Sequence, residues 1–140
     1  MQVNAEIVWA DITTEAEHKV TFGVAYRPDK GGSECMAKIC ESIDKIDSTD
    51  VILMGDFNCR DVEWTSGDAG TESGKRLLSA VEENLLSQLV TQPTHGNNIL
   101  DLVLTGNIDL IDSVRVNDAI GASDHLRTDV SVKLPRPHIN

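Results

Sequence analysis

Two short polar segments could carry out chemistry, and the first is the run "GDFN" that follows the apolar residues "VILM". Its Asp56 and Asn58 stand two positions apart, so their side chains point to the same side if the strand geometry continues past the apolar run. A carboxylate beside a carboxamide can hold and orient a water molecule or a phosphoryl oxygen. Both residue types also favour turns through local hydrogen bonds, so this segment alone favours a turn over a site.

The second segment is "ASDHL", in which Asp124 and His125 are neighbours. A carboxylate on a loop can bind a hard cation such as Mg²⁺, whose preferred ligands are oxygen atoms. An imidazole can accept or donate a proton near neutral pH. Taken by itself, the pair favours a capping aspartate and an exposed histidine, so a functional interpretation needs partners from elsewhere in the chain.

Asp101 is such a partner, because it interrupts the otherwise apolar run "NILDLVLTG". A lone carboxylate inside a strand is costly unless it is paired or hydrogen-bonded. One interpretation is that Asp101 orients the imidazole of His125, as carboxylates do in other acid–base sites. The alternative is that Asp101 lies on a solvated face that it shares with Ile99 and Val103.

Four further side chains, each with an aromatic or imidazole ring, are candidates for a functional role. Tyr26 closes the predicted strand "TFGVAYRP", and its hydroxyl could reach a phosphate; the alternative is a core aromatic whose hydroxyl is satisfied. His18 and His95 show no pattern of partners, and we assign them no role. Trp64 is interpreted as a packing anchor beneath a loop.

The elements that must position these residues follow from periodicity and breakers. The run 50–57 is apolar without alternation, which indicates a strand covered on both faces. Ser33 is a plausible N-cap for the first helix. The order of elements predicts an α/β or α+β fold, with helices packed on a sheet, in a single domain over 1–140. The predicted strands are 5–12, 18–28, 50–57, 99–105, 111–117 and 127–134, and the predicted helices are 33–46 and 75–89. The apolar side of the second helix comprises Leu77, Leu78, Val81, Leu85 and Leu89.

Composition narrows the class of protein. The 140 residues suit one domain, and 23 acidic against 12 basic residues give a net charge of -11. That charge argues against a basic nucleic-acid-binding face and suits a cation-binding or simply well-solvated protein. No apolar run approaches the roughly 20 residues of a membrane span, and the first residues do not resemble a secretory signal. Cys35, Cys40 and Cys59 form neither a paired framework nor a zinc spacing, which predicts reduced thiols in an intracellular protein.

The motifs occur in an order that resembles the endonuclease/exonuclease/phosphatase superfamily. The segments "YRPDK", "GDFNCRDVEW", "PTHGNNILDLVLT" and "ASDHL" are most similar to the endonuclease domain that precedes reverse transcriptase in non-LTR retrotransposons, and the likeness covers about residues 6–134. The resemblance implies a β-sandwich flanked by helices and a Mg²⁺-dependent site, with Mn²⁺ as a substitute. It also implies DNA as the substrate, a reverse transcriptase domain as a partner, and action in the nucleus.

The resemblance further implies a role for each matching residue. Asp56 would orient or deprotonate the attacking water, and Asn58 would hold the scissile phosphate. Asp124 would be a metal ligand, and the metal would polarise the phosphate and stabilise the leaving oxygen. His125 would contact the phosphate and stabilise its developing charge.

The remaining implied roles support those four residues. Asp101 would hydrogen-bond His125 and fix its orientation, and Tyr26 would contact the phosphate.

The sequence departs from the family pattern in one respect. The family domain has an earlier sheet half that carries an Asn and a metal-binding Glu, whereas Glu6, Glu15 and Glu17 lie in no matching motif here. The chain therefore resembles the C-terminal portion of the domain, and we expect an exposed sheet face or edge. Two alternatives stay open: a non-catalytic α/β relic or binding domain, and a phosphatase or lipid phosphodiesterase of the same superfamily.

Overall fold

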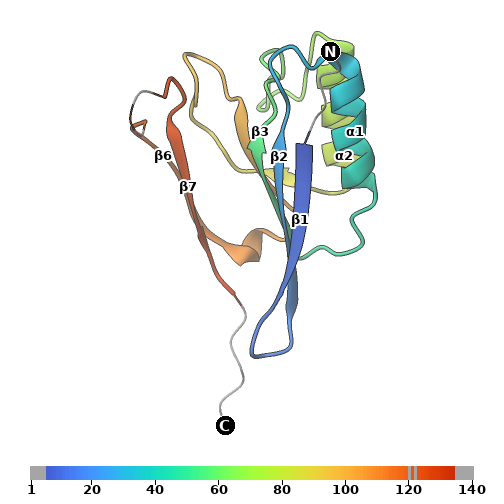
Figure 1. Ribbon diagram of the computed structural model, residues 1–140, viewed down its shortest axis with the longest axis vertical. Coiled ribbons are helices and arrows are strands. Elements are labelled where there is room, and N and C mark those ends of the chain that lie inside the picture. Colours follow the sequence, from blue (N-terminus) through green and yellow to red (C-terminus); the bar gives the residue numbers. More distant parts are fainter. Residues whose placement is uncertain (1–5, 120, 122, 135–140) are drawn as a thin grey trace.

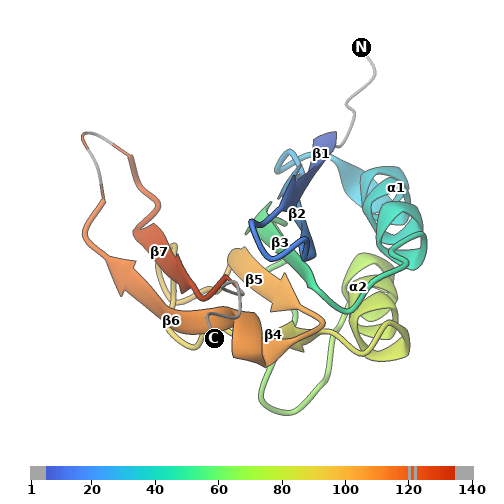
Figure 2. The same ribbon diagram turned by 90° about the horizontal axis from the view of Figure 1, so that it is seen from below.

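A mixed five-stranded sheet forms the centre of the computed structural model, which describes residues 6–119, 121 and 123–134. The strand order is β1-β2-β3-β5-β4, with helices α1 and α2 on one face and the two-stranded sheet β6-β7 on the other (Figure 1, Figure 2). The strands are β1 (Glu6–Thr13), β2 (Lys19–Tyr26), β3 (Val51–Asp56), β4 (Ser87–Gln88), β5 (Asp101–Thr105), β6 (Ile111–Asn117) and β7 (Arg127–Val132), and the helices are α1 (Gly32–Asp44) and α2 (Glu72–Glu83).

Strand β3 lies in the middle of the sheet and is buried on both faces, as the unbroken apolar run predicts. Leu53 packs toward the helices with Met36 and Leu77, whereas Ile52 packs toward the β6-β7 side with Val103. Strand β3 runs parallel to β2 and antiparallel to β5. The carboxyl ends of β2 and β3 therefore meet the amino end of β5 at one edge of the sheet.

The two helices differ from their predicted boundaries. Helix α1 is capped by Gly31 without a side-chain hydrogen bond, so the predicted cap at Ser33 is wrong. Helix α2 begins at Glu72 rather than at residue 75, because Thr71 caps it by accepting a hydrogen bond from the N–H of Gly74 at 3.0 Å.

The end of helix α2 also comes earlier than residue 89. The chain leaves the helix at Leu85, which has a φ of 54° and is 83% exposed. Helical spacing predicts Leu85 on the apolar side of this helix, and that prediction is wrong. The residues after it form β4, a short strand that pairs with β5 and that the sequence does not predict.

The remaining strands lie close to their predicted positions. The segment 111–117 is a strand with the predicted bounds, and the first strand is described from Glu6, since residue 5 lies outside the described residues. All three cysteines are buried thiols, and burial raises the pKa of Cys40 to about 11 and that of Cys59 to about 12. Among the described residues, no helix is long and apolar enough to cross a membrane.

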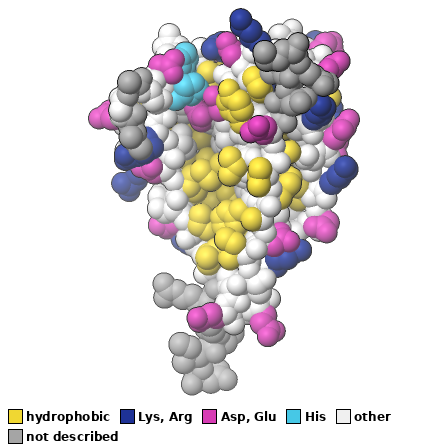
Figure 3. All heavy atoms as spheres, viewed as in Figure 1, with side chains coloured by type: hydrophobic (Ala, Val, Ile, Leu, Met, Phe, Trp, Pro, Cys, Tyr) yellow, Lys and Arg dark blue, Asp and Glu magenta, His cyan; other side chains and the backbone are white. Residues whose placement is uncertain are grey.

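One part of the sheet surface has no covering layer among the described residues. The β6-β7 pair covers the side of the sheet near β3 and β5, but Val8 is 68% exposed and its neighbour Val24 on β2 is 63% exposed. Together with the exposed Ile12, these side chains form what we call the open face. Figure 3 shows that hydrophobic side chains gather on the surface of the molecule in this view. In the described chain β7 pairs only with β6, so its other edge is unpaired beside this face.

Candidate active site

Four residues form a row across the sheet at its polar edge. In the strand register, Glu6 on β1 pairs with Tyr26 on β2, Tyr26 with Asp56 on β3, and Asp56 with Asp101 on β5. Laterally paired residues of a sheet project from the same face, so these side chains share the face that carries β6-β7. Residues far apart in sequence are thus brought side by side by strand pairing alone.

Gly55 makes the close approach of β2 and β3 possible at this row. Its φ is 149°, and a Cβ at this position would lie 1.8 Å from the carbonyl oxygen of Ala25. A side chain at residue 55 would therefore push the two strands apart. The glycine of the "GDFN" segment thus sets the position of the carboxylate that follows it.

His125 joins two carboxylates of the row. Its Nδ1 lies 2.9 Å from Asp101 Oδ2, and its Nε2 lies 3.6 Å from Asp56 Oδ2. The predicted contact between Asp101 and His125 is therefore present. Asp101, by its hydrogen bond and then its charge, raises the pKa of His125, and the nearby carboxylates add to the effect. Burial raises the pKa of Asp56, and the charge of Asp101 acts in the same direction.

Asp124 faces a different partner, His95. Asp124 Oδ2 lies 3.0 Å from His95 Nε2, and this hydrogen bond lowers the pKa of Asp124. Asp124 itself is 80% exposed. The rings of His95 and His125 lie 4.8 Å apart between their centroids. The neighbours Asp124 and His125 thus point to separate partners, and the two histidines connect the pairs.

Sequence reasoning assigned no role to His95, which the structure places inside the site. The partners are 29 residues apart along the chain, so no local spacing indicates their contact. Two sequence signals were present: His95 belongs to the segment "PTHGNNILDLVLT" that resembles the family, and it lies in the tight turn "HGNN" before the strand that begins with Asp101.

Thr94 holds together the two loops that carry the imidazoles. Its side chain is fully buried, and its Oγ1 accepts hydrogen bonds from the N–H groups of Leu100 and Asp101, each at 3.1 Å. Its carbonyl oxygen accepts a hydrogen bond from the N–H of Leu126 at 2.7 Å. The residue before one histidine is thus bonded to the residue after the other, which fixes the two rings beside each other.

Asn58 departs from the extended geometry on which its prediction depends. Its φ is 45°, a left-handed conformation that asparagine tolerates better than most residues. Its backbone N–H donates to Asp56 Oδ1 at 3.0 Å, and its side-chain amide donates to the carbonyl of Arg27 at 2.6 Å. The expectation that Asp56 and Asn58 project together from a continuing strand is therefore wrong, because the chain turns at Asn58.

Arg27 and Tyr26 have opposite environments. Arg27 is buried, and its guanidinium donates to the carbonyl oxygens of Asn58 and Gly32, each at 2.9 Å. It therefore ties together the loops that follow β2 and β3. Tyr26 is 48% exposed at the edge of the site, so it is not a core aromatic.

Two groups of side chains have the composition and spacing to hold a metal ion. One contains Asp56, Asp101 and His125, and the other contains His95, Asp124 and His125; within each group the ligand atoms lie within 4.8 Å of one another. Mg²⁺ takes oxygen ligands and usually binds through one or two carboxylates together with waters and substrate phosphates. Both the adjacent carboxylates of the row and the exposed Asp124 fit that requirement. No glutamate joins either group within the described part of the chain.

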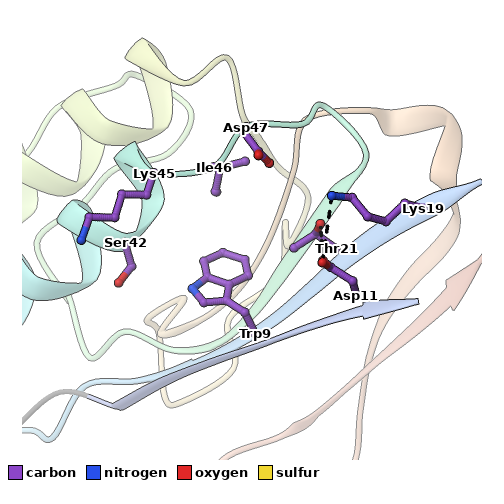
Figure 4. Close-up of a pocket in the computed structure, with 8 residues that line it drawn as sticks. All are labelled: Trp9, Asp11, Lys19, Thr21, Ser42, Lys45, Ile46 and Asp47. Atoms are coloured by element: carbon purple, nitrogen blue, oxygen red, sulfur yellow. Dashed lines mark hydrogen bonds and ion pairs between the residues drawn. The ribbon is translucent and has the colours of Figure 1, made fainter. Parts of the chain in front are cut away.

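A separate pocket lies on the helix side of β1 and β2, away from this row (Figure 4). Lys19, Lys45, Asp11 and Asp47 contribute both signs of charge to its lining, together with the ring of Trp9. We assign it no role in the chemistry of the row.

Comparison with known proteins fits this geometry. A family model described as endonuclease-reverse transcriptase matches residues 20–128. The chain belongs to this family. The resemblance expected from the motifs is thereby confirmed.

A solved structure adds the fold. The chain is similar to the endonuclease domain of TRAS1, a telomere-specific non-LTR retrotransposon, with a TM-score of 0.73 and 24% sequence identity. The match covers 91% of this chain and 62% of that domain, so the chain spans less than two thirds of the solved domain. The mixed α/β fold is therefore confirmed. No curated protein matches the chain.

Proposed function

We propose that this chain carries part of a Mg²⁺-dependent phosphodiester hydrolase site that acts on DNA. The observation that carries the proposal is the imidazole of His125 between Asp101, at 2.9 Å, and Asp56, at 3.6 Å. Membership of the endonuclease-reverse transcriptase family supports an endonuclease over other phosphodiesterases.

Each side chain of the site has a proposed role. Asp56 accepts a proton from the attacking water, and its raised pKa suits a general base. Asp101 holds the Nδ1 side of the His125 ring, so that Nε2 points away from β5. In this orientation a protonated imidazole stabilises the charge that develops on the phosphate. Tyr26 in the row, and Asn58 in the turn that follows β3, contact phosphate oxygens.

A cation fits the charge balance of the site. The chain carries a net charge of -11, and the site itself holds Asp56, Asp101 and Asp124. A polyanionic DNA strand is repelled by such a surface unless positive charge is supplied. Mg²⁺, with Mn²⁺ as a substitute, would be held by Asp124 and would supply electrostatic stabilisation of the phosphate and the leaving oxygen.

We further propose that the single domain formed by this chain packs against an additional layer of structure. The open face of Val8, Ile12 and Val24 is apolar and exposed, and one edge of β7 has no pairing strand among the described residues. The solved TRAS1 domain contains a part with no counterpart in this chain, since the match covers 62% of it. We propose that a β-layer equivalent to that part, carrying the family's metal-binding glutamate, packs on the open face. A linked reverse transcriptase domain and action in the nucleus are proposed on the family description alone.

Nicking of supercoiled plasmid tests the proposal. The purified chain, and the chain extended by its upstream reading frame, are incubated with DNA with and without Mg²⁺. We expect Mg²⁺-dependent nicking that Asp56→Ala and Asp124→Ala abolish and Asp112→Asn, an exposed pair partner of Lys133, leaves unchanged. Activity only in the extended protein would support the additional layer. Hydrolysis of phosphoinositides without nicking would reject DNA as the substrate.

A non-catalytic binding domain is the second candidate. It is favoured by the absence of a glutamate from both ligand groups of the described residues. Absence of nicking by both proteins in Mg²⁺ and in Mn²⁺ would favour this candidate over the endonuclease.

A further inference from the structure

Two imidazoles and a carboxylate converge at one end of the site, and this donor set differs from the one that Mg²⁺ prefers. His95, Asp124 and His125 each offer one ligand atom, and these atoms lie within 4.8 Å of one another. Nitrogen ligands of this kind suit Zn²⁺ and the neighbouring first-row transition ions, whereas Mg²⁺ takes oxygen ligands. We propose that these three residues form a binding site for a Zn²⁺-class cation.

The separation of the first two ligands already matches such a centre. Zn²⁺ binds imidazole nitrogen and carboxylate oxygen at about 2.0–2.1 Å in a tetrahedral arrangement, which places two ligand atoms roughly 3.3 Å apart. His95 Nε2 and Asp124 Oδ2 are 3.0 Å apart. A cation can therefore replace the hydrogen bond between them with a movement of a few tenths of an ångström.

His125 meets the remaining requirement of a metal-binding histidine. Such residues commonly give their second ring nitrogen to a carboxylate, which fixes the ring and makes the ligating nitrogen more basic. In this chain Asp101 Oδ2 takes the Nδ1 side of His125 at 2.9 Å, so Nε2, which lies 3.6 Å from Asp56 Oδ2, is the nitrogen that would bind the cation. The ring centroids of His125 and His95 lie 4.8 Å apart, and the ligand atom of His125 lies within 4.8 Å of those of His95 and Asp124.

The supporting loops hold both histidines in place without using their ligating atoms. The hydrogen bond from the N–H of Leu126 to the carbonyl of Thr94, at 2.7 Å, joins the two loops through the backbone. Asp124 is exposed, so a cation can enter from solvent and a water or an anion can take the fourth position. Such a centre is therefore open at one side.

The site has a consequence that rests on the proposed function. His125 and Asp124 are assigned to the phosphate and to Mg²⁺ in the hydrolytic site, so a cation shared with His95 withdraws both from that role. Zn²⁺ is then expected to inhibit Mg²⁺-dependent nicking. The binding itself does not depend on nicking, so it is measured separately.

Zn²⁺ titration of the complete chain by calorimetry, under reducing conditions, tests the site, with Co²⁺ absorption as a second readout. We expect one equivalent of Zn²⁺, with affinity at least about tenfold weaker in His95→Asn and in Asp124→Asn, and about 10–100-fold weaker in Asp101→Asn. His18→Asn is the matched control, because His18 also pairs with an aspartate, Asp50, but lies in neither ligand group of the described residues. It should bind as the wild type does.

Three results would overturn the proposal. The first is Zn²⁺ affinity that His95→Asn leaves unchanged while circular dichroism shows a folded protein. The second is displacement of the bound ion by Mg²⁺ at equal concentration, which would indicate a hard-cation site. The third is a cobalt–thiolate charge-transfer band, which would place the ion on the cysteines, although these are buried in the structure. If Zn²⁺ binds as expected and nicking is absent from every protein tested, the metal site stands and the proposed hydrolase does not.

Discussion

His125 Nδ1 lies 2.9 Å from Asp101 Oδ2, although 24 residues separate the two in sequence. Asp101 is the first residue of β5, and its register partner on β3 is Asp56. The imidazole is therefore held at the point where a buried strand ends and its antiparallel neighbour begins. This arrangement gives one histidine an oriented ring, a raised pKa and a second carboxylate within reach.

The first prediction concerns the proton affinity of that imidazole. Asp101→Asn removes the carboxylate charge and leaves at most a weaker, uncharged hydrogen bond to the ring, so the raised pKa of His125 should fall. Titration of the ring resonances by NMR measures it, with the resonances of His18 as an internal reference. An unchanged titration of His125 would show that Asp101 does not act on it in solution.

The same variant has a pH-dependent effect on stability. The raised pKa of His125 means that the folded chain binds the imidazole proton more tightly than the unfolded chain does. The protonated ring therefore stabilises the fold fully at pH values below its unfolded-state pKa, and this stabilisation is lost as pH rises through its folded-state pKa. Asp101→Asn should therefore destabilise the chain more at about pH 6 than at about pH 9. Urea unfolding at the two pH values measures the difference; an equal or reversed loss would contradict the assignment.

The ionised carboxylate of Asp56 is predicted to lower the stability of the folded chain at neutral pH. Burial raises its pKa, so the folded state loses stability as pH rises from the ordinary value of 3.8 through the folded value. Asp56→Asn keeps the side-chain shape and removes the charge, and should raise the melting temperature at about pH 8 with a gain that shrinks toward about pH 4. A lower melting temperature at both pH values would mean that the carboxylate stabilises the fold.

The planar guanidinium of Arg27 is predicted to stabilise the two segments that follow β2 and β3. Arg27→Lys keeps the charge but cannot donate to the carbonyls of Asn58 and Gly32 together, and should cost about 1–3 kcal/mol in the free energy of unfolding. Arg60→Lys is the control, because Arg60 forms an ion pair with Asp29 that is exposed to solvent, and such pairs contribute little to stability. Chemical denaturation compares the two, and similar losses would argue against a structural role for Arg27.

Gly55 is predicted to be irreplaceable for steric reasons. Gly55→Ala places a methyl group 1.8 Å from the carbonyl oxygen of Ala25 at a φ of 149°, and should cost about 3 kcal/mol or more. Gly70→Ala is the matched control, since its methyl group would meet only Asp61 at 3.9 Å. Thermal unfolding separates the two; a stable Gly55→Ala would mean that the strands can move apart.

Features set by local periodicity could be predicted from the sequence. The buried strand β3 follows from an unbroken apolar run, and β6 matches its predicted range. The convergence of Asp56, Asp101 and His125 was expected because motif order implied a family whose fold brings them together. Asp101 and His125 do form the expected contact.

Features set by long-range contact or by a single dihedral angle could not be predicted. His95 contacts Asp124 across two distant loops, which are joined by the hydrogen bond between the Leu126 N–H and the carbonyl of Thr94. Asn58 leaves the strand through a left-handed turn, and Leu85 does the same at the end of helix α2. Apolar spacing continues through Leu85 without any mark of that turn.

The rate of Mg²⁺-dependent nicking by His125→Gln decides whether the oriented imidazole takes part in phosphodiester hydrolysis. His18→Gln is the matched control, because both histidines pair with an aspartate but only His125 contacts the carboxylates of the row. In whichever protein nicks DNA, the chain alone or its extended form, His125→Gln should lower the rate about a hundredfold or more and His18→Gln should leave it unchanged. Equal nicking by wild type and His125→Gln, or no nicking by any protein tested, would contradict the account.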